Sequence, residues 1–130
     1  MRVVLDTSVL VSGLLSSEGP PAQIINLFLN KTITLLYDNR VLLEYKEVLK
    51  RKKFGFKQER IEPIIEFIKQ EGEFISAEPT NVKITDKDDL KFVEVAITGK
   101  ANYLITGNEK HFPKLNLIKT PKEFLESIKR

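Results

Sequence analysis

Short apolar runs alternate with helical patterns along most of the chain. The apolar runs are rich in β-branched and aromatic residues and predict strands at Val3 to Leu5, Ile33 to Tyr37, Tyr103 to Thr106 and Leu117 to Lys119, with a weaker one at Phe74 to Ser76. Helical spacing predicts helices from about Val9 and over Ala22 to Asn30, Asn39 to Lys52, Gln58 to Gln70, Asp88 to Gly99 and Pro121 to Lys129. Such alternation favours an α/β fold, in which right-handed crossovers build a mostly parallel sheet covered on both faces.

The chain has the length and composition of a single compact domain. Its 130 residues contain no internal repeat, low-complexity tract or long linker, and its 42% hydrophobic and 30% charged residues are ordinary for a soluble globular protein. Proline and glycine mostly fall between the periodic segments, where turns are expected. We therefore predict one domain over residues 1–130.

The residue types that are missing restrict the chemistry. The sequence has no cysteine, which excludes disulfides, iron–sulfur clusters and thiolate zinc sites, and its single histidine, His111, excludes a polyhistidine metal site. Any metal must then be held by oxygen. The longest uncharged stretches, such as Val9 to Ser17, are too short to span a bilayer, and no signal-peptide pattern follows Met1. We expect a cytoplasmic protein without a membrane partner.

The first predicted strand ends in polar residues. Asp6, Thr7 and Ser8 directly follow the apolar run Val3 to Leu5. In open α/β sheets, ligands gather at the carboxyl ends of strands, near the point where the strand order reverses. Asp6 is therefore a candidate functional residue. The alternative is that Asp6 or Thr7 merely caps the helix that follows.

A second candidate acid lies at the start of the helix predicted over Asp88 to Gly99. On a helical projection its apolar stripe consists of Leu90, Val93, Ala96 and Ile97. Asp89 falls near the middle of this stripe, whereas Lys91 and Glu94 project to the opposite side and Asp88 is free to cap the helix. An acid on an apolar face needs a partner. The first-turn amides and the helix dipole are the structural alternative.

The third candidate acid is Glu44, on the helix predicted from Asn39. The same projection places the core face of this helix at Val41, Leu42, Tyr45, Val48 and Leu49. Glu44 lies at the border of that face, and Glu47 lies farther towards solvent. Pairing of Glu44 with a lysine one turn away is the alternative.

Polar residues also follow the predicted strand at Tyr103. Thr106, Gly107 and Asn108 offer a hydroxyl, a permissive backbone and an amide, although a plain turn explains Gly-Asn equally well. If this strand lies beside the first, Asp6, Asp89 and Asn108 converge and Glu44 reaches in from the adjoining helix. Ionised carboxylates crowd together only around a cation, and oxygen ligands suit Mg²⁺ or Mn²⁺. The pattern indicates a metal-dependent phosphodiesterase.

The sequence resembles the PIN-domain family of ribonucleases over nearly its whole length, and in particular the toxin-like branch found in prokaryotic toxin–antitoxin systems. The resemblance rests on the order and spacing of short motifs: Leu5-Asp6-Thr7-Ser8, Leu43-Glu44-Tyr45 with Val48-Leu49 and Arg51, Asp86-Lys87-Asp88-Asp89 leading to Ala96, Tyr103 to Asn108, and Pro121 to Leu125.

The resemblance implies a three-layer α/β/α sandwich around a mostly parallel sheet, with an acidic cleft that binds Mg²⁺ or Mn²⁺. Asp6, Glu44 and Asp89 match the first three acids of the family, which serve as metal ligands and catalytic residues. The fourth position, commonly aspartate, is Asn108, which weakens the case for a second metal ion. Ser8 and Thr106 match hydroxyl positions that orient metal-bound water or substrate, and we assign Asn108 to the same positioning group.

The resemblance also implies an RNA substrate, an antitoxin protein as partner and a homodimer. Our leading hypothesis is a metal-dependent endoribonuclease. The second is a catalytically weak or inactive PIN-like module that binds RNA or a partner protein, which Asn108 favours. A phosphoacceptor signalling domain is a third; it requires an aspartate at the end of the third strand and a lysine after the fifth, for which Lys119 is a weak match.

Two further features are left outside the predicted site. The basic residues Lys50 to Lys53 and Lys57 interleave with Phe54 and Phe56, which suits either contact with a polyanion or a solvated helix end. His111 lies in a Lys-His-Phe-Pro turn and is interpreted as structural.

Overall fold

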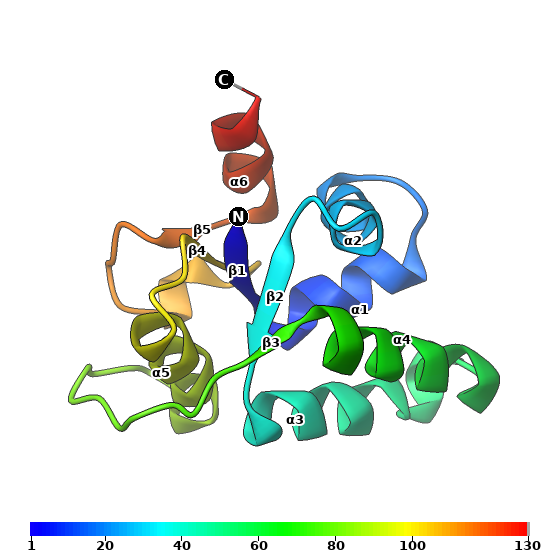
Figure 1. Ribbon diagram of the computed structural model, residues 1–130, viewed down its shortest axis with the longest axis horizontal. Coiled ribbons are helices and arrows are strands. Elements are labelled where there is room, and N and C mark those ends of the chain that lie inside the picture. Colours follow the sequence, from blue (N-terminus) through cyan, green and yellow to red (C-terminus); the bar gives the residue numbers. More distant parts are fainter. Residues whose placement is uncertain (130) are drawn as a thin grey trace.

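Five parallel strands form one sheet at the centre of the protein, in the order β3-β2-β1-β4-β5 (Figure 1). The structure is a computed structural model and describes residues 1–129. The strands are β1 Arg2–Leu5, β2 Thr34–Tyr37, β3 Glu73–Phe74, β4 Tyr103–Ile105 and β5 Ile118–Lys119. Every pairing is parallel, as the alternation of strands and helices predicts.

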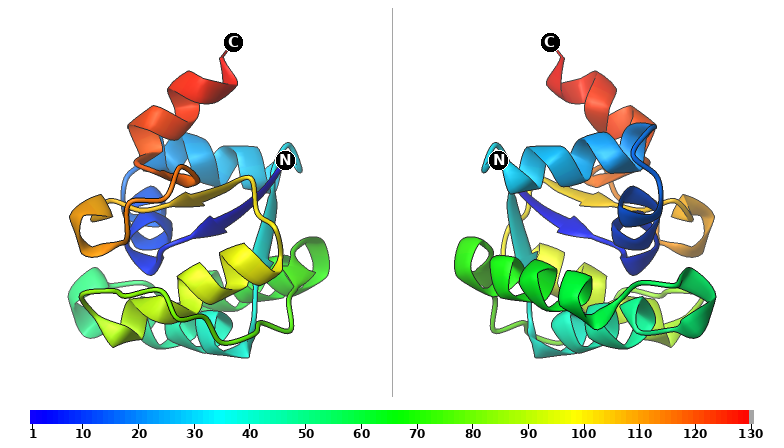
Figure 2. Two further views of the ribbon diagram at one scale, coloured as in Figure 1. Left: turned by 90° about the vertical axis from the view of Figure 1, so that its left-hand side faces the viewer. Right: turned by 90° about the vertical axis from the view of Figure 1, so that its right-hand side faces the viewer.

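Helices cover the sheet on both faces. Figure 2 shows α2 and α6 on one side of the central strands and α5 on the other. The α-helices are α1 Thr7–Leu15, α2 Pro20–Leu29, α3 Asn39–Leu49, α4 Gln58–Glu71, α5 Leu90–Thr98 and α6 Pro121–Ile128, and the 3₁₀ turns are η1 Lys52–Phe54, η2 Lys87–Asp89 and η3 Glu109–His111. The result is the expected three-layer α/β/α sandwich. Within residues 1–129, no helix is both long enough and apolar enough to cross a membrane.

The middle strand of the sheet is β1, and its three apolar residues, Val3 to Leu5, are fully buried. The chain builds β2 and β3 on one side of β1 before it crosses to build β4 and β5 on the other. The strand order therefore reverses between β1 and β4, which pair with Leu5 opposite Ile105. In parallel sheets this reversal is where ligands gather. The condition under which the polar ends of these two strands meet, that the strands lie side by side, is therefore fulfilled.

Helix boundaries differ from the prediction where local chemistry decides them. Helix α2 begins at Pro20 rather than Ala22, because proline fits the first turn of a helix. The predicted helix from Asn39 ends at Leu49 rather than Lys52, and a separate 3₁₀ turn follows at Lys52–Phe54. The helix predicted from Asp88 starts with a 3₁₀ turn, η2, before α5 begins at Leu90.

Two helix starts are fixed by side-chain caps. The carboxylate of Asp38 accepts a hydrogen bond from the Val41 amide at 2.9 Å and starts α3. At α6, the Thr120 hydroxyl accepts from the Glu123 amide at 3.1 Å while Glu123 Oε1 accepts from the Thr120 amide at 2.8 Å. This reciprocal pair is a capping box, and with Pro121 at the first position it confirms the predicted start of the last helix.

Candidate active site

Asp6 lies where β1 ends, and its side chain points into a hydroxyl-lined site instead of capping α1. Its backbone occupies the N-cap position of α1, but its carboxylate forms no capping hydrogen bond. Oδ2 instead accepts from Thr106 Oγ1 at 2.7 Å and from Ser8 Oγ at 3.2 Å. Only 6% of Asp6 is exposed. The capping alternative is therefore wrong for the Asp6 side chain.

The end of β4 supplies the groups that orient Asp6. The Asp6 amide donates to the Ile105 carbonyl at 2.9 Å, so the pairing of β1 with β4 continues up to the carboxylate. Thr106 is completely buried, and its Oγ1 also accepts from the Asn108 amide at 3.0 Å. Asn108 itself is exposed, and it is the backbone amide of this residue that bonds to Thr106.

Glu44 reaches this site from α3. The Thr7 hydroxyl donates to Glu44 Oε2, and the Lys91 ammonium forms an ion pair with Oε1 at 2.7 Å. One residue on, the buried Tyr45 hydroxyl donates to the Leu5 carbonyl at 2.6 Å. Helix α3 is thus attached to the end of β1 by two side chains, which fixes Glu44 relative to Asp6.

Asp89 lies opposite, on the 3₁₀ turn that precedes α5. Its carboxylate forms no capping bond to α5, and the turn itself is capped by Asp86, whose carboxylate accepts from the Asp88 amide at 2.9 Å. Burial, and then the charges of Asp6, Asp86 and Glu44, raise the pKa of Asp89 to about 6. Burial is also the main reason that the pKa of Asp6 is raised, although the hydroxyls of Thr106 and Ser8 oppose it. These acids lie close enough to repel one another.

The acids border a cleft of about 450 Å³. Its lining combines carboxylates and hydroxyls with a guanidinium and with aromatic and aliphatic groups; the lining residues are Thr7, Ser8, Val11, Ser12, Leu15, Glu44, Val48, Arg51, Phe54, Asp86, Asp88 and Asp89. Of the predicted site residues, Ser8, Glu44 and Asp89 line this cleft directly. Asp6, Thr106 and Asn108 are not part of the lining. Asp6 is connected to it by the hydrogen bond from Ser8, and Thr106 in turn donates to Asp6.

The donor types in this cleft fit a hard divalent cation. The acids offer only oxygen, the ligand that Mg²⁺ and Mn²⁺ prefer. Burial, and then the charges of neighbouring carboxylates, raise the pKa of Asp6 and of Asp89, and Lys91 opposes the rise at Asp89 only in part. The side chains of Asp6, Glu44 and Asp89 share the site without converging on one point: within residues 1–129, no three acidic or histidine side chains form a preassembled metal cluster.

The predicted projection of the helix at Asp88 to Gly99 is wrong for Lys91 and Glu94. Both were expected to face solvent, yet the Lys91 side chain is 13% exposed and Glu94 is buried. Ile97, expected in the core, is exposed, whereas Phe92 and Val95 are buried. The reason is that α5 packs against α3 as well as against the sheet, so a second, polar face of the helix is also covered.

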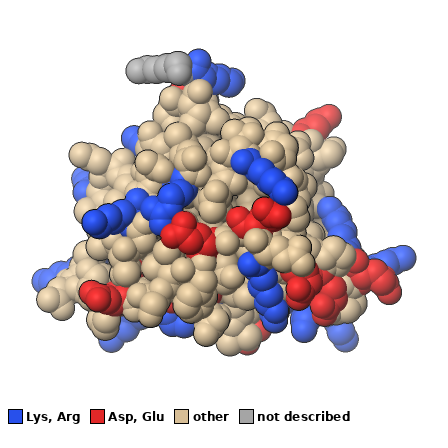
Figure 3. Space-filling view, in the orientation of Figure 1, with Lys and Arg blue, Asp and Glu red and all other residues tan. Residues whose placement is uncertain are grey.

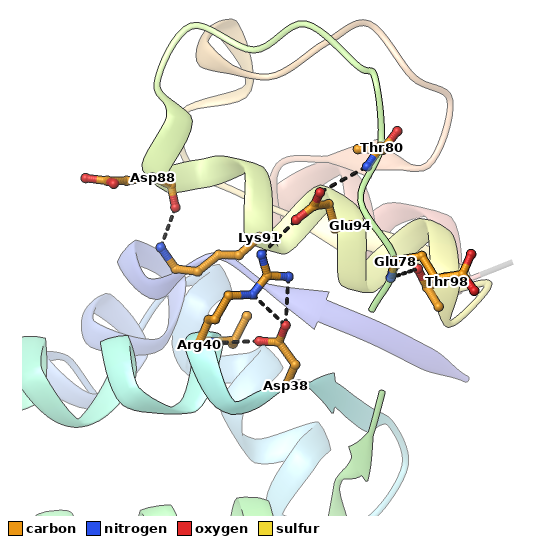
Figure 4. Close-up of polar contacts among 9 residues, drawn as sticks. Asp38, Arg40, Glu78, Thr80, Asp88, Lys91, Glu94 and Thr98 are labelled. Carbon is orange, nitrogen blue, oxygen red and sulfur yellow. Dashed lines mark hydrogen bonds and ion pairs between the residues drawn. The ribbon is translucent and has the colours of Figure 1, made fainter. Parts of the chain in front are cut away.

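Glu94 is the centre of a polar network between α3, α5 and the segment before η2 (Figure 4). Its Oε1 pairs with Arg40 at 2.7 Å, and its Oε2 accepts from the Thr80 amide at 3.0 Å. Arg40 also pairs with Asp38 at 2.8 Å. Lys91, one turn away, donates to the Asp88 carbonyl as well as pairing with Glu44. The network holds the Asp88–Asp89 turn against α3.

Sequence reasoning therefore missed Lys91 as a neighbour of the site. Its partner, Glu44, is on another helix, and a projection of one helix carries no signal for a contact between two. Tyr45 was assigned to the core correctly, but its hydrogen bond to Leu5 was not foreseen. A buried tyrosine usually finds a partner for its hydroxyl, which is the signal that could have indicated this bond.

Comparisons with known proteins agree with this architecture. The family model described as PIN domain matches residues 2–110. The chain is 30% identical to the uncharacterized protein MJ1680 of Methanocaldococcus jannaschii, in an alignment that covers 100% of this chain and 93% of that protein. The crystal structure of VapBC2 from Rickettsia felis, bound to a DNA fragment from its promoter, superposes with a TM-score of 0.61 at 20% identity, over 92% of this chain and 98% of that one.

The likeness to the Rickettsia structure concerns the fold, since the identity is low. The family model, in contrast, spans most of the sequence, and its range includes β1, α3, α5 and β4, the elements that carry the acids and hydroxyls of the cleft. The relative from Methanocaldococcus aligns along the full chain. The chain therefore belongs to the PIN-domain family.

Proposed function

We propose that this protein is a Mg²⁺- or Mn²⁺-dependent endoribonuclease and the toxin of a toxin–antitoxin pair. Membership of the PIN-domain family supports a nuclease in general. The observation that supports metal dependence is the environment of the Asp6 carboxylate. This buried carboxylate is oriented by two hydroxyls, makes no capping bond, and lies in a group of mutually repelling acids. Such an arrangement is unfavourable unless a cation completes it.

The residues of the chain have distinct roles in this proposal. Asp6 and Asp89 would be the main metal ligands, with Glu44 holding the metal or its water. Thr106 and Ser8 both donate to Asp6 Oδ2, so Oδ1 is the oxygen that these two hydroxyls leave free. When bound, the metal supplies positive charge that acidifies water and neutralises charge on the scissile phosphate.

Lys91 and Asn108 favour one metal ion rather than two. The Lys91 ammonium already neutralises part of the charge on Glu44. Asn108, at the position of the fourth acid, is uncharged and exposed, and its side chain does not line the cleft. Fewer uncompensated carboxylates remain than a two-metal site requires.

The proposed function includes two protein partners, an antitoxin and a second copy of this chain. The solved neighbour is VapBC2 bound to promoter DNA, and its likeness in fold supports a toxin that is neutralised by an antitoxin protein. We expect a homodimer as well. Co-expression with the protein encoded beside this one, followed by purification and light scattering, measures both: a stable complex and a dimeric mass are the expected results. A monomer that binds no such protein would contradict this part of the proposal.

The nuclease itself is tested with Asp6→Asn and single-stranded RNA in Mg²⁺. Loss of the carboxylate should reduce cleavage at least about a hundredfold while the fold persists, because Asn keeps the shape of Asp but not its charge. Glu126→Gln, an exposed acid on α6, is the matched control for loss of one charge and should cleave as the wild type does. Equal cleavage by wild type and Asp6→Asn would show that the activity does not come from this site.

The second candidate is a PIN-like module that binds RNA or a partner without cutting, which the neutral Asn108 favours. Such a module would show no cleavage by the wild type in Mg²⁺ or Mn²⁺, and little stabilisation by either metal. The phosphoacceptor hypothesis receives no support, because Ile75 and Ser76 follow the end of β3 where that class requires an aspartate.

A further inference from the structure

A basic segment connects α3 to α4, and two of its residues, Arg51 and Phe54, line the cleft. We define residues 50–57 as the basic arm: it begins after Leu49, passes through η1 and ends before Gln58. It contains five cations, Lys50, Arg51, Lys52, Lys53 and Lys57, and no acid. The net charge of the whole chain is +3, so the remainder of the protein is acidic overall.

The charges of the basic arm are exposed and, within residues 1–129, form no ion pair with an acid, and the Lys53 ammonium lies 5.1 Å from the centre of the Phe54 ring. All five cations are exposed, and none forms an ion pair with an acid in the part of the chain that the structure describes. On the face shown in Figure 3, by contrast, basic and acidic side chains lie beside one another. An unpaired basic segment on such a surface is suited to an external anion.

Helix capping does not account for these residues. Basic side chains at the end of α3 would complement the helix dipole, and Lys46 in the last turn and Lys50 at the cap do so. Lys52, Lys53 and Lys57 lie beyond the end of the helix, in η1 and at the start of the next one. The dipole acts only over the final turn, so these three cations require another explanation.

The basic arm and the acids face the same cleft. Arg51 and Phe54 line it together with Ser8, Glu44 and Asp89. The acids of the cleft repel the phosphates of a nucleic acid, whereas the cations of the basic arm attract them. A strand held by the arm would therefore be brought to the acids despite its own charge.

The aromatic rings of the basic arm are presented beside its charges. The rings of Phe54 and Phe56 lie 6.3 Å apart and are tilted by 35°, and both residues are partly exposed. Gly55, with a φ of 70°, makes the left-handed turn between them. Arg60 stacks over Phe56 at 5.0 Å and donates to the Leu14 carbonyl at 2.7 Å, which anchors the segment to the end of α1. The arm is thus held in place at the cleft.

We propose that the basic arm docks single-stranded RNA, with phosphates on Arg51, Lys52 and Lys53 and an unpaired base on Phe54. Cations that follow the backbone and an aromatic face that stacks on a base are the chemistry by which single strands are bound. This inference rests on the proposed nuclease function for its substrate. Beyond that function, the proposal names the surface of this chain that would bind the RNA strand, and it expects a preference for unpaired bases.

Binding without cleavage tests the basic arm separately from catalysis. A short fluorescent oligouridylate is titrated in EDTA, and its anisotropy is measured at several KCl concentrations. Lys52→Gln with Lys53→Gln should weaken binding and lower the slope of log K against log salt by about 1.4, since each lost phosphate contact removes about 0.7 for a single strand. The matched control is Lys122→Gln with Lys129→Gln on and just after α6, remote from the cleft, which should bind as the wild type does.

Phe54→Leu tests the stacking part. Leucine keeps an apolar side chain at the cleft, so affinity should fall about fivefold or more while the salt slope stays unchanged. Duplex RNA, whose bases are not free to stack, should bind less tightly than the single strand and be indifferent to this substitution. If the double lysine variant matches its control, the basic arm does not dock RNA; an acidic protein partner for this surface would give that result. If Phe54→Leu is neutral, no base stacks on Phe54 and that part of the proposal is refuted.

Failure of this inference is distinguishable from failure of the nuclease. Cleavage by the wild type together with unaltered binding by the variants of the basic arm would refute the docking surface alone. Salt-dependent binding through the arm with no cleavage would refute the nuclease alone.

Discussion

Two buried acids in this protein, Asp6 and Glu94, have opposite surroundings. Each is 6% exposed. Glu94 receives the guanidinium of Arg40 on one oxygen and the Thr80 amide on the other. Asp6 receives hydroxyls from Thr106 and Ser8, and within residues 1–129 no lysine or arginine forms an ion pair with it.

Under the proposed function, this difference separates a structural acid from a metal-binding one. The charge of Glu94 is neutralised inside the fold, so it holds α3, α5 and the preceding segment together without any ligand. The charge of Asp6 is oriented but not neutralised, and its pKa is raised by burial. The hydrogen bonds from Thr106 and Ser8 orient the Asp6 carboxylate without neutralising it, which supports the proposal that it binds a cation from outside.

The largest effect on stability is expected from Arg40→Met. Removing the guanidinium leaves Glu94 and Asp38 buried without their cation, and breaking a buried ion pair in this way is strongly unfavourable. Because half of the Arg40 side chain is exposed, we expect a loss of about 2 to 3 kcal/mol in the free energy of unfolding, measured by urea denaturation. A stability equal to that of the wild type would remove the distinction drawn here between compensated and uncompensated acids.

Lys91→Met should convert Glu44 from a compensated acid into an uncompensated one. The metal-free protein should lose about 1 kcal/mol, because the Lys91–Glu44 pair is only partly exposed. Its affinity for Mn²⁺ should rise about three- to tenfold, since one more negative charge then faces the cation. Titration calorimetry measures this change, and a fall in Mn²⁺ affinity would mean that Lys91 supports the metal site rather than competing with it.

The stability of the metal-free protein should fall as the pH rises through the pKa of Asp89. That pKa is raised from 3.8 to about 6, so the folded state binds a proton more tightly than the unfolded state. The stabilisation is fully present below the unfolded value and is lost by the time the pH has passed about 6. Allowing for solvent screening of this half-buried group, the difference is about 1 kcal/mol.

The measurement is the melting temperature of wild type and Asp89→Asn between pH 4 and pH 7 in EDTA, roughly the interval between the unfolded and folded pKa values. The difference between the two proteins should change over this interval in favour of the variant at higher pH. Parallel curves would show that burial and the neighbouring acids do not raise the pKa of Asp89 in the folded protein.

The smallest effect is expected from Asn108→Asp. This substitution restores the acid that is common at the fourth position of the family, but the side chain is exposed and lies outside the lining of the cleft. The affinity for Mn²⁺ should therefore change less than about threefold, because a solvated charge at this distance interacts weakly. A much larger gain would place the side chain of residue 108 in the metal site and would favour a second metal ion.

Much of the fold could be predicted from the sequence because its signals are local. The apolar run Val3 to Leu5, the polar residues after it, and the Thr120–Pro121 helix start each carry their own physical reason. The adjacency of the first strand and the strand at Tyr103 entered the sequence argument only as a condition, and the structure fulfils it.

The contacts between helices could not be predicted in this way. A projection of one helix treats the side away from the sheet as solvent, so Lys91 and Glu94 were assigned to water although α3 covers them. The same limit applies to the capping of the turn at Asp89, where Asp86 rather than Asp88 provides the cap. These features depend on which elements pack together, and the pattern within any one element does not contain that information.

The most direct test of the account is thermal stabilisation by Mn²⁺ at neutral pH, measured for wild type and Asp6→Asn. Binding at ten times its dissociation constant is worth about 1.4 kcal/mol, so the wild type should melt about 3 to 6 °C higher with the metal. Asp6→Asn should show no such rise, and without metal it should be at least as stable as the wild type, because it lacks the uncompensated charge. An equal rise in both proteins, or none in the wild type, would contradict the claim that Asp6 is held ready for a cation.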